Sequence, residues 1–109
     1  GIPTPEITFP EDANSNGTLS SGENSTDPDN TTAKITIPAD AKPGDTLKVT
    51  VTGPDGNPVS QDIPLTPDNI ANGVEITVPV QDGKTSSVEA FIQDQNGNTG
   101  GTANGSIAV

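Results

Sequence analysis

The chain has 109 residues and a formal net charge of −11, with four Lys, no Arg, no His and no Cys. Its length predicts a single domain, and the scarcity of cations excludes nucleic acid and anionic membrane surfaces as partners. The missing Cys exclude disulfides, and no apolar run is long enough to predict a membrane-spanning helix.

The chain opens with a short segment that leads into the first predicted strand. Residues 1–5 contain Pro3 and Pro5, and we expect them to form a linker-like lead-in to one domain that spans residues 1–109. Because the first residue is not Met, we expect an excised domain or a mature fragment. Glu6–Pro10 is the first predicted strand, with its two apolar side chains on one face.

A loop of the calcium-binding type follows this strand. It matches the pattern D-x-[DN]-x-[DN]-G-x5-E at every defined position. Ca²⁺ takes roughly six to eight oxygen ligands, which alternating side chains of such a loop supply while its Gly permits the sharp turn. The predicted ligands are oxygens of Asp12, Asn14, Asn16, Thr18, Ser20 and Glu23, with Thr18 acting through its carbonyl.

A polar loop without metal is the alternative for this segment. Ser20–Glu23 also fits the S-x-x-E pattern of a helix-capping box. The segments on either side, Ile7–Phe9 and Thr31–Ile37, alternate like strands, whereas helices flank an EF-hand loop. If calcium does bind, amides at two ligand positions give a low ligand charge, which indicates a weak site suited to millimolar extracellular calcium.

Apolar residues alternate with polar ones through most of the remaining chain, and turn residues separate the alternating runs. The further predicted strands are Ala33–Ile37, Thr46–Thr52, Val59–Thr66, Val74–Val80, Val88–Ile92 and Ile107–Val109. In the fourth strand, Val59, Ile63 and Leu65 are expected to be in phase on one face. Residues 67–73 are expected to form a loop with room for one short helical turn.

Two of the intervening turns predict hairpins. Gly53–Asn57 has strong turn chemistry and joins the strands that precede and follow it, and Asp94–Asn98 carries an Asn-Gly pair. Seven strands at roughly ten-residue spacing are typical of an antiparallel β-sandwich. We therefore predict an all-β, Ig-like sandwich with Greek-key connections, with a jelly roll or another Greek key as the alternative.

Three motifs resemble a known family. Gly44–Val51, the turn Gly53–Gly56 and the motif Asp94–Thr99 are similar to bacterial Ig-like repeats. Most similar are the tandem extender domains of large repeats-in-toxin (RTX) adhesins of Gram-negative bacteria, a group that includes ice-binding and biofilm adhesins. The resemblance covers nearly the whole chain.

The resemblance implies an extracellular domain at the bacterial cell surface that holds a ligand-binding tip away from the cell. Its partners would be neighbouring repeats of the same chain, and calcium in loops and at domain junctions would stiffen the array. Carried over to this chain, the loop ligands above remain the first candidates. Asp27 and Asp29 would complete that site or form a second one, and Asp94 and Asn98 are further candidates at one pole. We expect the isolated domain to be a monomer.

Two other functional classes compete with this reading. An enzyme is disfavoured, because the chain lacks the His and Cys of most nucleophile–base pairs and the Trp and Tyr of a sugar platform. The alternative that stays open is a ligand-binding adhesin module, which recognises a protein, or a glycan through calcium, by its loops.

Overall fold

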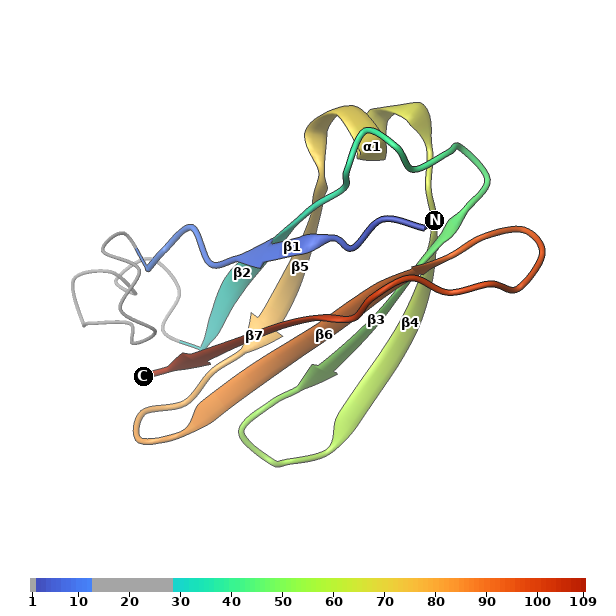
Figure 1. The fold of residues 1–109 in the computed structure, drawn as a ribbon. Coiled ribbons are helices and arrows are strands. Elements are labelled where there is room, and N and C mark those ends of the chain that lie inside the picture. The colour runs from blue at the N-terminus through green and yellow to red at the C-terminus, as the bar shows by residue number, and fades with distance from the viewer. Residues whose placement is uncertain (1, 13–28) are drawn as a thin grey trace.

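The computed structural model describes residues 2–12 and 29–109, which form two antiparallel β-sheets packed face to face (Figure 1). The smaller sheet has the order β1-β2-β5 and the larger sheet the order β4-β3-β6-β7. The strands are β1 (Glu6–Thr8), β2 (Asn30–Thr36), β3 (Thr46–Thr52), β4 (Pro58–Pro64), β5 (Val74–Pro79), β6 (Thr85–Gln93) and β7 (Ala103–Ala108). The prediction of an all-β sandwich is confirmed.

The connections pass between the two sheets in the manner of an Ig-like Greek key. The chain leaves β2 in the smaller sheet for the β3–β4 hairpin of the larger one, returns to β5, and then crosses back to the β6–β7 hairpin. The fourth strand distinguishes this sandwich from the constant-type Ig domain. Here β4 pairs with β3 and not with β5, so it lies at an edge of the larger sheet.

The centre of the fold is β3, whose bounds agree with the sequence prediction. Its apolar residues Leu47, Val49 and Val51 alternate with Thr and Lys and are buried between the sheets. On β6, their antiparallel partners Ile92, Ala90 and Val88 are buried too. Strict alternation specifies this pairing, because a shift by one residue would turn the apolar face outward.

The β3–β4 hairpin also forms as predicted, but one of its apolar residues stays exposed. The turn at 53–57 places Gly56 at φ 79°, and the Asp55 carboxylate accepts a hydrogen bond from the Asn57 N–H at 3.0 Å. Leu65 is buried and Ile63 half-buried, whereas Val59 is 67% exposed. The prediction that Val59 and Ile63 are in phase is confirmed, because they lie opposite Val51 and Leu47 of β3. Val59 is nevertheless exposed, because in the described chain no strand of the smaller sheet lies opposite that end of β4.

Several strand ends differ from the prediction. Strand β1 ends at Thr8, two residues early, and β4 ends at Pro64, because Thr66 instead becomes the N-cap of a helix. Conversely, β2, β6 and β7 begin earlier than expected, within polar stretches that have no apolar alternation. Pairing with a neighbouring strand extends these segments, and sequence periodicity does not report such pairing.

A short helix, α1 (Pro67–Asn72), lies between β4 and β5, where we expected a loop with room for one short helical turn. Thr66 and Asn69 form a capping box, in which each side chain bonds the main chain of the other residue. Pro67 occupies the first turn, where its missing N–H costs nothing. Ile70 packs against the core, so the helix covers part of the space between the sheet edges.

The opposite edge of the sandwich is closed by a close approach of β1 and β7. A Cβ built on Gly105 of β7 would lie 2.9 Å from Ile7 Cγ2 and 3.1 Å from Phe9 Cε2. A Cβ on Gly100 would lie 2.7 Å from the main-chain oxygen of Ile2. The absence of a side chain at Gly100 and Gly105 therefore lets the N-terminal segment and β1 pack directly against the β6–β7 hairpin. No helix in the described residues is long and apolar enough to cross a membrane.

Candidate functional site

The first predicted calcium ligand, Asp12, lies just beyond β1 and is only 7% exposed. Its N–H donates to the main-chain oxygen of Phe9 at 3.0 Å, which turns the chain as it leaves the sheet. The other predicted ligands of this loop lie outside the described residues: Asn14, Asn16, Thr18, Ser20 and Glu23. The further candidate Asp27 lies outside them too. The metal assignment of the loop therefore remains a prediction.

The described residues on both sides of that segment are acidic and hydrogen-bonded. The buried Thr31 hydroxyl donates to the Glu11 carboxylate at 2.6 Å, which ties the end of the first strand to β2. Asp29, a further candidate ligand, accepts a bond from the Val80 N–H on its main-chain oxygen at 2.9 Å. Asp12 and Asp29 are the described residues that border the segment 13–28.

The candidates Asp94 and Asn98 lie together in the β6–β7 turn at the other end. The Asp94 Oδ1 accepts bonds from the N–H groups of Asn96 and Asn98, both at 2.9 Å, and Oδ2 accepts from the Asn98 side-chain amide at 3.3 Å. The bond from the Asn98 N–H, the largest effect, holds the pKa of the Asp94 carboxyl below its ordinary value of 3.8, although desolvation opposes it. This carboxylate therefore stabilises its own turn in the ionised state.

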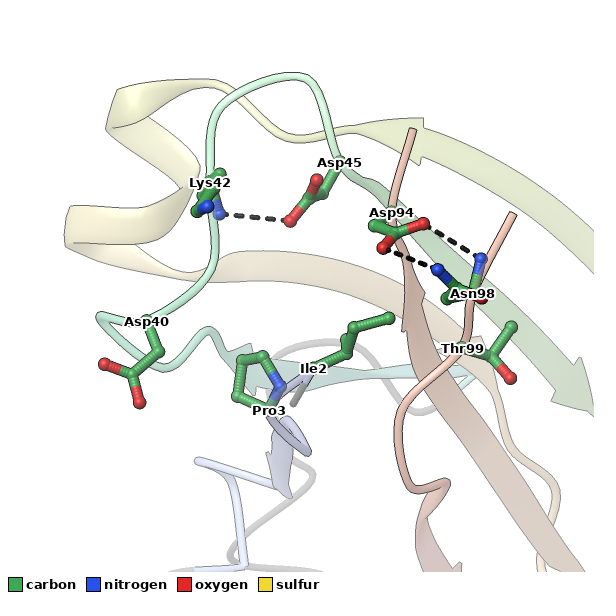
Figure 2. A pocket seen from close by; sticks show the side chains of 8 residues that line it. All are labelled: Ile2, Pro3, Asp40, Lys42, Asp45, Asp94, Asn98 and Thr99. Carbon is green, nitrogen blue, oxygen red and sulfur yellow. Dashed lines mark hydrogen bonds between the residues drawn. The ribbon is translucent and has the colours of Figure 1, made fainter. Parts of the chain in front are cut away.

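An open pocket of about 490 Å³ lies beside this turn. Figure 2 shows the side chains that line it. Its wall includes Asp40, Asp45 and Asp94 from separate loops, with Ile2 and Pro3 across from the turn. Asp45 is 7% exposed, and its Oδ2 accepts a bond from the Lys42 N–H at 3.1 Å.

The three carboxylates of this pocket do not converge on one point. Asp45 and Asp94 face hydrogen-bond donors of their own loops, and Asp40 is exposed on the rim (Figure 2). Over residues 2–12 and 29–109, no three His, Cys, Asp or Glu side chains form a group that could hold one metal ion.

This pocket was not predicted from the sequence, although part of it has a local sequence signal. Lys42-Pro43-Gly44-Asp45 has the composition of a turn, and an Asp that ends such a turn commonly bonds its main chain. What the sequence lacks is any sign that residues 2–3 lie against the 94–99 turn, since that contact spans almost the whole chain. The pocket is thus a product of the fold and not of a motif.

The two ends of the sandwich are well separated, and each holds one end of the chain (Figure 1). Ile2 lies beside the β6–β7 turn, while Val109 exchanges main-chain bonds with Gly83 and Lys84 in the β5–β6 turn. These turns lie at opposite ends of β6, whose nine residues span roughly 30 Å at about 3.4 Å per residue.

No protein-family model matches the chain, and searches of curated proteins and of solved structures found no match to it either.

Proposed function

We propose that this protein is a non-catalytic, calcium-stabilised spacer domain of a long bacterial surface adhesin. In this role the domain is one of several repeats in tandem, outside the cell, which together hold a ligand-binding tip away from the surface. Its immediate partners are the neighbouring repeats.

The observation that carries the proposal is the placement of the two chain ends. Ile2 and Val109 lie at opposite ends of the sandwich, beside turns that the length of β6 separates. A domain linked at both ends therefore adds its full strand length to an array. A domain whose ends lie side by side would add far less.

The calcium part of the proposal rests on the loop pattern and on its described end. Asp12 supplies a carboxylate at the base of the loop, and Asp29 stands at the other side of the same segment. The buried core of the described chain consists of Ala, Val, Leu and Ile side chains. A domain with such a core has little margin of stability, so a bound ligand matters to its folding. A ligand at 100 times its dissociation constant adds about 2.7 kcal/mol to the free energy of unfolding.

Thermal unfolding with excess calcium and with a chelator tests the metal. We expect the midpoint to rise by several degrees in calcium, since 1 kcal/mol moves a domain near this size by roughly 4–8 °C. Glu23→Gln should remove most of that rise, because the pattern gives this residue the bidentate position. The matched control is Glu89→Gln, an exposed position in the middle of β6, which should keep the full rise.

An equal midpoint in calcium and chelator would contradict the metal. A full rise that persists in Glu23→Gln would move the site away from the loop.

Small-angle scattering of a two-copy fusion tests the spacer role separately. We expect the longest dimension to grow by about one strand length, roughly 30 Å, for the added copy. A fusion no longer than one copy would contradict the spacer role, whatever the result of the calcium experiment.

A further inference from the structure

A second groove lies on the other side of the sandwich, between β4 and β5. It has a volume of about 470 Å³ and is walled by Val51, Val59 and Gln61 of the larger sheet, Thr77 and Pro79 of β5, and Asp55 in the β3–β4 turn. None of these residues belongs to the predicted calcium loop or to the pocket beside the β6–β7 turn.

The groove exists because the larger sheet extends one strand beyond the smaller one. On β4, Val59, Gln61 and Ile63 share the inner face, but within the described chain the smaller sheet ends at β5. Ile70 of α1 packs on the core near one end of this overhang, where Ile63 is half-buried. At the other end Val59 is 67% exposed.

The edge of β5 that faces this groove offers main-chain hydrogen-bonding groups. Bonds to one neighbour alternate along an antiparallel strand, and the Val80 N–H donates to Asp29 of the chain leading into β2. The main-chain N–H and C=O groups of even-numbered residues of β5 therefore point toward β2. Those of odd-numbered residues point toward the groove. Pro79 has no N–H, so Thr77 presents the nearest donor, together with its carbonyl. In the described chain β5 pairs with β2 alone.

The neighbouring free edge, on β4, has a proline at each end, whereas β5 has one, Pro79, at a single end. The Leu65 N–H donates to the main-chain oxygen of Asp45 at 2.8 Å. The main-chain groups of odd-numbered residues of β4 therefore point toward β3, and those of even-numbered residues point away from the sheet. Pro58 and Pro64 occupy two of those outward positions and supply no donor. Asp62, at a third, pairs with Lys48 at 3.2 Å.

The overhang also decides what can add to β5. A second copy that paired through its own β5 would bring its larger sheet over the space that β4 already fills. A single extended segment meets no such obstacle, because one strand laid along β5 lies beneath the overhang. The groove thus admits one strand and rejects a folded copy.

The lining indicates the chemistry of that strand. Val51 and Val59 favour an apolar side chain at every second residue, the spacing that faces one side of a strand. Among the described residues of the lining, Asp55 is acidic and none is basic, and the whole chain carries −11. Opposite charge on the incoming segment is therefore favoured.

We propose that this groove binds an extended, cationic peptide segment, which adds as a fourth strand to β5 and covers Val59. Main-chain bonds to Thr77 supply part of the affinity, and the apolar side chains that enter the groove supply selectivity. This activity is independent of the spacer role, because it uses neither the chain ends nor calcium.

The test is a titration of ¹⁵N-labelled protein with the peptide Lys-Val-Thr-Val-Thr-Val-Lys, followed by NMR. We expect saturable shifts centred on Thr77 and Val59, with slowed hydrogen exchange of the Thr77 amide. The peptide Glu-Val-Thr-Val-Thr-Val-Glu should bind at least about tenfold more weakly. Sedimentation should show one copy of the protein in the complex.

Two variants identify the groove as the binding site. Thr77→Pro removes an outward N–H while leaving the bonds to β2, and should weaken binding about tenfold, since a net hydrogen bond is lost and the ring blocks the edge. Val59→Lys, at an exposed position, should abolish binding by charge without affecting folding. The matched control is Ser60→Lys on the other face of β4, which should bind the peptide almost as the original chain does.

Absence of saturable binding would overturn the proposal, and so would binding that survives both Thr77→Pro and Val59→Lys. Peptide-independent dimers formed through β5 would overturn it as well. Equal binding of the acidic peptide would overturn the cationic assignment.

Discussion

The two sides of this sandwich are built on opposite principles. On the β1–β7 side, Gly105 brings a strand of each sheet into direct contact, and a Cβ there would lie 2.9 Å from Ile7 Cγ2. On the β4–β5 side the larger sheet runs past the smaller one and leaves Val59 exposed. A sandwich with a thin core can thus pack one edge tightly and leave the other edge open for contacts with another molecule.

The largest expected effect is the difference in stability lost when an apolar side chain is shortened on each side. Ile107→Ala on the closed side should lower the free energy of unfolding by about 2–5 kcal/mol, because Ile107 is 0% exposed. Val59→Ala on the open side should change it by less than about 0.5 kcal/mol, since little area is lost from the core. Urea unfolding of both variants measures the difference. Equal losses would show that the open side carries as much of the core as the closed side.

A smaller effect tests the close approach itself. Gly105→Ala should destabilise the fold by about 1–3 kcal/mol, because the added methyl overlaps Ile7 Cγ2. Ile7→Ala removes that atom, so the double variant should lose less than the sum of the two single variants. Strict additivity in urea unfolding would place the cost of Gly105→Ala in the backbone and not in this contact.

The smallest effect concerns Asp94 in the β6–β7 turn, which leads into β7 on the closed side. Hydrogen bonds from Asn98 and Asn96 hold the pKa of Asp94 below 3.8 in the folded chain. Its contribution to stability is therefore complete above about pH 3.8 and is lost as the pH falls through the folded-state value. Asp94→Asn should be less stable than the original chain at pH 7, and the two unfolding midpoints should approach each other below pH 3.8. A difference that stays constant with pH would assign the effect to packing.

The closed side and the central strand were partly visible in the sequence. The strict alternation of Thr46–Thr52 fixes the bounds of β3 and its buried face, and the turn at 53–57 identifies its hairpin partner. The start of β7 was missed because Gly105 takes an inward position where the pattern expects an apolar side chain. That glycine has meaning only beside Ile7, nearly a hundred residues earlier.

The open side could not be predicted for a related reason. Val59 has the phase of a core residue, and periodicity reports the face of a strand but not whether anything lies opposite it. The overhang depends on how many strands each sheet has, which is a property of the whole topology. The same limit applies to the pocket beside Asp94, where Ile2 arrives from the far end of the chain. The calcium pattern at Asp12–Glu23 is a local signal and remains a prediction.

The two prolines of β4 have a consequence for how the hairpin assembles. Pro58 and Pro64 are six residues apart, so both turn their nitrogens away from β3 in the native alignment. A one-residue slip would point both nitrogens at β3, where the ladder needs donors, and two hydrogen bonds would be lost together. The pair of prolines therefore disfavours a one-residue slip of the hairpin.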